Sequence, residues 1–150
     1  MRRAKTGRAM NIGLGERRRT ILLVDVDAHA RAILRKALEA ANFSVGEAAN
    51  NREGERTALR IRPDAILADL MTDGADDVRT VSEKLRASGC EIPCYIVSTA
   101  GEALVGSVGL HEIGVSGVFL KPVDTSIVIQ TLKTRLGVTE QIRQGDIGRA

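Results

Sequence analysis

Residues 63–71 read PDAILADLM, in which a proline precedes an apolar run that ends at a carboxylate, Asp69. Three other short apolar runs also end in a polar side chain: ILLVD at Asp25, YIVST at Thr99 and GVFLK at Lys121. Runs of this length are typical of strands in a buried parallel sheet. Ligands of such sheets bind outside the carboxyl ends of the strands. We therefore expect two carboxylates, a hydroxyl and an ammonium group to meet on one rim.

Helical patterns alternate with these strands, which predicts an α/β domain with a doubly wound, five-stranded parallel sheet. Asn50 and Asp124 are expected to cap the helices that follow them, and Asn42 to close the first helix. The expected strands span residues 20–25, 43–48, 65–69, 94–99 and 117–121, and the expected helices span residues 28–41, 50–61, 76–87, 102–113 and a segment that begins at 124.

Two of these helices carry an apolar stripe with steps of three and four residues, which is typical of a helix packed on a core. In the first helix the stripe comprises Ala30, Ile33, Leu34, Ala37, Leu38 and Ala41. In the last helix it comprises Ile127, Val128, Thr131, Leu132 and Leu136.

The composition indicates one globular domain, here residues 20–136 with a polar tail at 137–150, because 43% of the 150 residues are apolar and 27% are charged. Aromatic residues make up 2%, which argues against a stacking platform for single-stranded nucleic acid. No apolar run is long enough to span a membrane or to form a signal peptide. A cytoplasmic location is therefore expected, with Cys90 and Cys94 as reduced thiols.

Residues 1–19 form a basic arm. Up to Thr20 the chain carries seven basic residues and one acidic residue, a net charge of +6, whereas the remainder carries 15 basic and 18 acidic residues, a net charge of −3. One interpretation is electrostatic contact with nucleic acid or an acidic partner. The other is a solvated leader, or a start site placed too early with Met10 as the true one.

The four strand ends, in this order, resemble those of the receiver domain of bacterial two-component response regulators. The resemblance covers about residues 20–136 and rests on ILLVD, PDAILADLM, YIVSTA and GVSGVFLKPVD. It implies the (βα)5, flavodoxin-like receiver fold. It also implies a signalling protein that transfers a phosphoryl group only to itself, rather than an enzyme with a separate substrate.

The resemblance further implies a role for each site residue. Asp69 is the expected phosphoacceptor, which receives the phosphoryl group from a sensor histidine kinase or a phosphotransfer protein. Thr99, or alternatively the adjacent Ser98, would hydrogen-bond a phosphoryl oxygen, and Lys121 would pair with the phosphoryl group as a point charge. A cis peptide bond is expected between Lys121 and Pro122.

Magnesium is the cofactor that the resemblance implies, held by Asp25, Asp69 and the backbone carbonyl of Met71. Where the family usually has a second acid after Asp25, this chain has Val26. Asp27 could supply the missing oxygen only if the loop is rearranged. Weak magnesium binding is therefore expected.

The leading hypothesis for function is a stand-alone receiver that signals through a surface for a downstream protein, or through homodimerisation. The alternative is a degenerate receiver, an interaction module that keeps the fold but not the phosphorylation cycle. Val26 favours this alternative, in which Lys121 would pair with Asp69 without any phosphate. Val118, at the family's aromatic switch position, also departs from the pattern. A small α/β enzyme is the weakest hypothesis, since the chain has no GxGxxG, P-loop or GxSxG motif.

Overall fold

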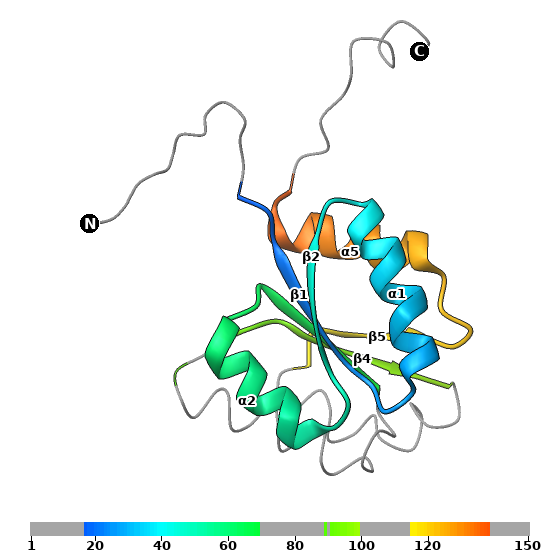
Figure 1. Cartoon of the computed structure of the whole chain (residues 1–150). Helices are drawn as coiled ribbons and strands as arrows, with labels where there is room; N and C mark the ends of the chain where they lie inside the picture. The colour runs from blue at the N-terminus through cyan, green and yellow to red at the C-terminus, as the bar shows by residue number, and fades with distance from the viewer. Residues whose placement is uncertain (1–16, 70–88, 90, 100–114, 139–150) are drawn as a thin grey trace, which may run out of the picture.

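The structure is a computed structural model of the 150-residue chain. It describes residues 17–69, 89, 91–99 and 115–138 (Figure 1). Cys94, one of the two predicted thiols, is a buried free cysteine. Several predictions fall outside the described residues: the arm before residue 17, the helices expected at 76–87 and 102–113, the tail after residue 138, Met71 and Cys90.

Five strands form one parallel sheet in the order β2-β1-β3-β4-β5, which is the flavodoxin-like strand order. Every expected strand is present and agrees with its predicted range to within one residue at either end. The predicted fold class is therefore confirmed. The strands are β1 (Thr20–Val24), β2 (Ser44–Ala48), β3 (Ala65–Asp69), β4 (Cys94–Ser98) and β5 (Gly117–Leu120).

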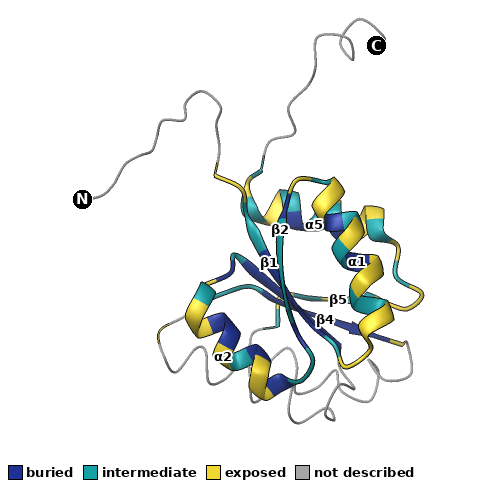
Figure 2. Ribbon diagram, in the orientation of Figure 1, coloured by how far each residue is buried: buried dark blue, intermediate teal, exposed yellow. Residues whose placement is uncertain are grey.

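Helices cover both faces of the sheet. Those among the described residues are α1 (Ala28–Ala40), α2 (Asn51–Ile61) and α5 (Thr125–Leu136), and none of them is long and apolar enough to cross a membrane. Helices α1 and α5 lie on one face and α2 on the other (Figure 1). Successive strand residues point to opposite faces, so Leu23 of β1 packs toward α1 and α5, whereas Leu22 packs toward α2. In Figure 2, buried residues are concentrated along the strands and on the helix faces that turn toward the sheet.

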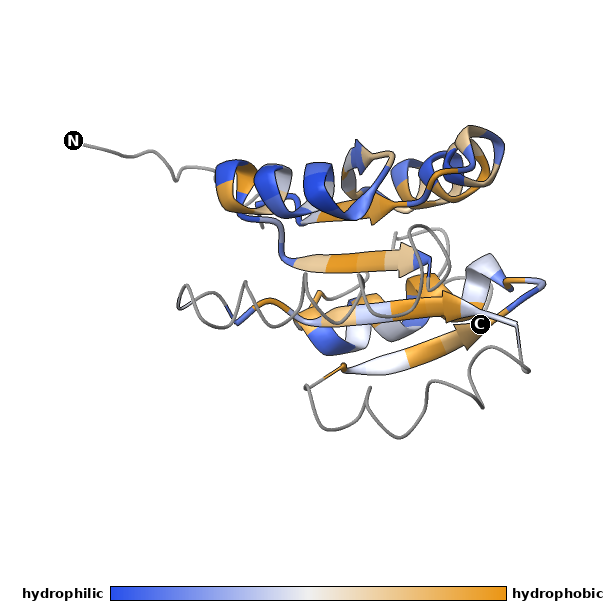
Figure 3. Ribbon diagram, turned by 90° about the horizontal axis from the view of Figure 1, so that it is seen from below, coloured by the Kyte–Doolittle hydropathy of each residue, from blue (hydrophilic) through white to orange (hydrophobic). Residues whose placement is uncertain are grey.

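The central strand, β3, is buried at all five positions, whereas the edge strand β5 exposes Val118 and Leu120. Figure 3 shows the strands as mainly hydrophobic ribbons. Burial on both faces explains why the sequence of β3 is continuously apolar instead of alternating. Asp69, the last residue of β3, is therefore a carboxylate at the end of a strand that is buried on both faces, with 7% of its surface exposed.

The helix ends follow the predicted caps. The Asn50 side-chain oxygen accepts a hydrogen bond from the backbone amide of Glu53 at 2.8 Å, and the Asp124 carboxylate accepts one from Ser126 at 2.9 Å. Asn42 follows α1 with a φ of 74°, the left-handed conformation common just after a helix. All three predicted cap positions are confirmed.

The apolar stripes of α1 and α5 are narrower than the sequence indicates. Ile33 and Ile127 belong to the predicted stripes but are 52% and 54% exposed. The buried members of each helix are four residues apart, so they form one row along the helix, and neighbours such as Ile129 are only partly buried against the core. Each exposed isoleucine precedes its row by one residue, about 100° around the helix axis. The buried residues are Leu34 and Leu38 in α1 and Val128 and Leu132 in α5.

Helix α2 approaches β1 closely at Gly54. A Cβ atom at this position would lie 2.9 Å from Cγ2 of Val24, which is closer than real Cβ contacts allow. Glycine permits this packing even though it lowers helix propensity by about 1 kcal/mol. The contact sets α2 directly against the strand residue that precedes Asp25.

Arg17 and Arg19, which the sequence assigns to the basic arm, contact the amino-terminal edge of the sheet. Their guanidinium nitrogens lie 3.2 and 4.0 Å from Oδ1 of Asp64. The other carboxylate oxygen of Asp64 accepts the backbone amide of Thr20 at 2.8 Å. Asp64 thus links the last residues before β1 to the start of β3.

Candidate functional site

The carboxyl ends of four neighbouring strands carry the residues that the sequence singles out. Asp69 is the last residue of β3, and Asp25, Thr99 and Lys121 each follow the last residue of β1, β4 and β5. The backbone ladder continues past the strand ends, since the Lys121 amide donates to the carbonyl of Ser98 at 2.8 Å. In the strand order β1-β3-β4-β5 the four residues occupy consecutive positions along one rim.

Asp69 and Lys121 form an ion pair at this rim. The Lys121 Nζ lies 2.6 Å from Oδ2 of Asp69. The Asp69 side chain is 8% exposed and that of Lys121 is 39% exposed, so the ammonium group reaches a buried carboxylate from the surface. A charged contact this short offsets part of the cost of burying the carboxylate.

Asp25 adds a second carboxylate to the rim. Burial is the largest influence on this group and raises its pKa, and the nearby charge of Asp69 raises the pKa further. A hydrogen bond from the Asp27 amide to Oδ1 of Asp25, 2.9 Å long, and the charge of Lys121 lower the pKa, but the net shift is upward. Two carboxylates and one ammonium group leave the rim with an excess of negative charge.

Ser98 and Thr99, the two candidates for the hydroxyl role, have different environments. Ser98 is fully buried, and its Oγ donates a hydrogen bond to the carbonyl of Thr99 at 2.8 Å. Thr99 is exposed. The hydroxyl of Ser98 therefore stabilises the end of β4, while Thr99 lies at the surface of the rim.

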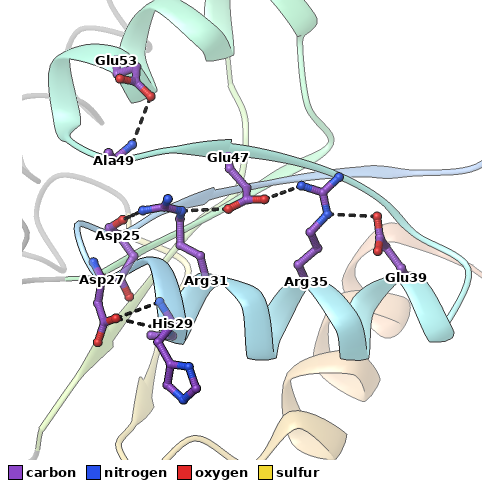
Figure 4. A network of polar contacts seen from close by, with 10 residues as sticks. Asp25, Asp27, His29, Arg31, Arg35, Glu39, Glu47, Ala49 and Glu53 are labelled. Atoms are coloured by element: carbon purple, nitrogen blue, oxygen red, sulfur yellow. Dashed lines mark hydrogen bonds and ion pairs between the residues drawn. The ribbon is translucent and has the colours of Figure 1, made fainter.

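The loop after β1 does not replace the missing acid. Val26 is 63% exposed, and its side chain has no oxygen. The Asp27 carboxylate caps α1, because its Oδ1 accepts the amides of His29 at 2.9 Å and Ala30 at 3.3 Å (Figure 4). The rearrangement that would turn this carboxylate toward Asp25 is not observed. Within the described residues no group of three or more His, Cys, Asp or Glu side chains could hold a metal ion.

Arg31 also contacts the loop, and sequence reasoning missed it. Its Nη1 donates to the backbone carbonyl of Asp25, and its Nε lies 2.8 Å from Oε1 of Glu47 (Figure 4). A signal was available in the sequence, because Arg31 comes one helical turn after the capping residue Asp27. Helical side chains lean toward the helix amino terminus, which brings Arg31 back over the loop.

Comparison with known proteins identifies the family. A family model described as the response regulator receiver domain matches residues 21–133, most of the chain. The chain belongs to the response regulator receiver family. Receiver domains are signalling domains of two-component systems, and the predicted membership of this family is thereby confirmed. The cis peptide bond expected between Lys121 and Pro122 is present in this receiver domain.

Two curated relatives are named transcriptional regulatory proteins. ResD of Bacillus subtilis is 33% identical to this receiver domain over 119 residues, and PrrA of Mycobacterium tuberculosis is 30% identical over 116 residues. Each alignment covers 77% of this chain, but only 47% of ResD and 49% of PrrA. The chain thus spans about half the length of these relatives.

Solved receiver structures share the fold. The receiver domain of NtrX from Brucella abortus superimposes with a TM-score of 0.70 at 18% identity, covering 79% of this chain and 99% of that one. The chemotaxis response regulator CheY4 of Vibrio cholerae superimposes with a TM-score of 0.69 at 22% identity, covering 80% and 99%. The receiver fold is therefore kept at low sequence identity.

Proposed function

We propose that this receiver domain accepts a phosphoryl group on Asp69 from a sensor histidine kinase or a phosphotransfer protein. The observation that carries the proposal is the 2.6 Å contact between Lys121 Nζ and Asp69 Oδ2. This contact provides a cation beside the carboxylate that would accept the phosphoryl group. The cation would offset the repulsion between the phosphoryl oxygens and the nearby charge of Asp25.

The transfer requires positioning more than chemical activation. A carboxylate oxygen of Asp69 attacks phosphorus, the phosphorus–nitrogen bond of the donor histidine breaks, and its electron pair returns to the imidazole. The product is an acyl phosphate on Asp69. Lys121 would then pair with a phosphoryl oxygen. We assign the hydroxyl that binds another phosphoryl oxygen to Thr99, because Ser98 is buried and donates to a backbone carbonyl.

The carboxylates of this rim are suitable ligands for magnesium, but the rim offers the ion fewer protein ligands than receiver domains usually do. Carboxylate oxygens are preferred ligands of the ion, and Asp25 and Asp69 would supply them, together with the carbonyl of Met71, which lies outside the described residues. When bound, the ion would neutralise negative charge at the phosphoryl oxygens. Because Val26 offers no oxygen and Asp27 caps α1, we propose that binding is weak.

We propose that the domain passes its signal on by binding a downstream protein at its surface, or alternatively by forming a homodimer. Val118, at the expected aromatic switch position, lies on the edge strand β5 and is 40% exposed. It has no ring that could turn inward on phosphorylation. Any change of conformation would therefore be transmitted without the family's aromatic side chain. The expectations of a stand-alone protein and of a cytoplasmic location stay predictions.

A degenerate receiver is the second candidate, and the loop after β1 favours it. Val26 replaces an acid, and Asp27 uses its carboxylate as a helix cap. In such a protein the Lys121–Asp69 ion pair would serve stability alone, and partners would recognise the unmodified domain.

Treatment with a small phosphodonor and magnesium, followed by intact-mass measurement, separates the two candidates. We expect wild type to gain one base-labile phosphoryl group and Asp69→Asn to gain none. Asp27→Asn is a matched control, since it removes a neighbouring acid while keeping a side chain that can cap α1. It should still be phosphorylated. An unchanged wild-type mass across several donors and magnesium concentrations would favour the degenerate receiver.

A further inference from the structure

The connection between β1 and α1, residues 25–27, includes Asp25, one of the two carboxylates of the site. Both the backbone amide and the backbone carbonyl of Asp25 form hydrogen bonds to other elements. The Asp25 amide donates to the carbonyl of Ala48 in β2 at 3.0 Å. The Asp25 carbonyl accepts a hydrogen bond from the guanidinium of Arg31 in α1. Within the loop, the Asp27 amide donates to Oδ1 of Asp25 at 2.9 Å. The direction of the Asp25 carboxylate therefore depends on these backbone contacts.

Arg31 is itself held in place. Its side chain is 16% exposed, and its Nε lies 2.8 Å from Oε1 of Glu47 in β2. The other oxygen of Glu47 pairs with Arg35, whose Nε lies 3.1 Å from Oε2 of Glu39 (Figure 4). A guanidinium group is planar, with donors in fixed directions. Because Glu47 holds Nε, the Nη1 donor is directed at the Asp25 carbonyl.

The side chain of Val26 contributes little to fixing this loop. It is 63% exposed and has no polar atom, so it neither packs in the core nor forms a hydrogen bond. The Asp27 carboxylate accepts hydrogen bonds from backbone amides in the first turn of α1. Arg31 also binds the backbone of this segment, at the Asp25 carbonyl, and this hydrogen bond is charge-assisted, which makes it stronger than a neutral hydrogen bond.

We propose that Arg31 is a positioning residue for phosphoryl transfer. Glu47 holds the Arg31 guanidinium group, which binds the Asp25 carbonyl and thereby fixes how the Asp25 carboxylate faces Asp69. The inference rests on the proposed function of Asp69. Arg31 contacts the Asp25 carbonyl and Glu47, and it acts on the site through Asp25. Positioning matters in such a site, because a displacement of about 1 Å can cost about 100-fold in rate.

The test compares Arg31→Gln and Arg31→Lys with the matched control Arg35→Gln. The control also removes one arginine partner of Glu47, but Arg35 pairs with Glu47 and Glu39 instead of binding the Asp25 carbonyl. Two properties are measured: the rate of Asp69 phosphorylation from a small phosphodonor, and hydrogen exchange of the Asp27 amide with no donor or metal present. The second readout reports directly on the hydrogen bond from the Asp27 amide to Asp25.

We expect Arg31→Gln to slow phosphorylation about 10- to 100-fold and to accelerate exchange of the Asp27 amide. Arg31→Lys keeps a charged donor for the carbonyl and should recover part of both properties, whereas Arg35→Gln should change neither. Equal behaviour of Arg31→Gln and Arg35→Gln would overturn the proposal and leave Arg31 as a member of the ion-pair network alone. If wild type accepts no phosphoryl group, the proposed function fails, and the exchange comparison by itself decides whether Arg31 fixes the loop.

Discussion

The Nζ of Lys121 lies 2.6 Å from Oδ2 of Asp69, although the two residues stand at the ends of strands that are not neighbours. Strand β4 lies between β3 and β5 in the sheet. The lysine side chain therefore extends past the end of β4 to reach the central strand. This ion pair connects the edge of the sheet to the predicted phosphoacceptor.

A double-mutant cycle measures that connection. Lys121→Met should lower the free energy of unfolding by about 1–2 kcal/mol, because it removes a cation from a buried carboxylate while the lysine itself is partly exposed. The same change in an Asp69→Asn background should cost less, since the neutral amide does not need the cation. Urea denaturation of the four proteins gives the coupling energy. A coupling energy near zero would mean that the contact adds nothing to stability.

Restoring the missing acid should strengthen metal binding. Val26→Asp places a carboxylate beside Asp25, and we expect magnesium to bind on the order of 10-fold more tightly, since a close additional charge contributes about 1 kcal/mol or more. Val26 is 63% exposed, so the fold should tolerate the change. Val26→Asn is the control, because it adds an oxygen without the charge. Equal magnesium affinities for Val26→Asp and wild type, measured by titration calorimetry, would contradict this account of Val26.

The ion pairs of Glu47 should make stability depend on pH. Hydrogen bonds from Arg31 and then Arg35 lower the pKa of Glu47 below its ordinary value of 4.5. A carboxyl group whose folded pKa is lowered stabilises the fold above its unfolded pKa, and this contribution is lost as pH falls through the folded pKa. Wild type should therefore be more stable than Glu47→Gln at neutral pH, and the difference should shrink below pH 4.5.

Thermal unfolding at a series of pH values checks this expectation. Glu39→Gln is the control, since Glu39 pairs with Arg35 one turn away on the exposed side of α1 and such pairs contribute little. A stability difference between wild type and Glu47→Gln that stays constant from neutral pH to well below 4.5 would show that the carboxylate charge is not responsible.

Gly54 should be intolerant of a larger side chain. Gly54→Ala would gain about 1 kcal/mol of helix propensity, but its Cβ would lie 2.9 Å from Cγ2 of Val24, a stiff side chain in the core. Overpacking of this kind costs about 1–3 kcal/mol, so we expect a net loss of stability. In a Val24→Ala background, which provides the missing space, the same Gly54→Ala change should cost less than it does in wild type. If the single variant is as stable as wild type, α2 can move away from β1 without cost.

The strands and caps could be predicted because local chemistry determines them. The continuous apolar run of β3 requires burial on both faces, and Asn50 and Asp124 have oxygens that can satisfy the amides of a first helical turn. The rim followed from topology, since parallel strands bring their carboxyl ends to one edge. The order of Asp25, Asp69 and Lys121 along the chain was therefore sufficient to predict that they converge.

Contacts between distant elements could not be predicted in the same way. The position of Arg31 depends on the register of β2, which brings Glu47 beside α1, and no local pattern encodes that pairing. The exposure of Ile33 depends on how wide a face of α1 the sheet covers, which periodicity alone does not determine. Asp27, by contrast, immediately precedes the helix expected to begin at residue 28, so its role as a helix cap could have been inferred from the sequence.

The contact of Arg17 with Asp64 has a practical consequence for handling this domain. Asp64 precedes β3, and α5 runs back from the rim (Figure 1), so Arg17 and the end of α5 lie toward the edge of the sheet opposite the carboxyl ends of its strands. A surface tether, a fluorescent label or a second protein joined at either of these positions would leave the approach to Asp69 open. A kinase could then be tested against the immobilised domain without the attachment itself blocking access.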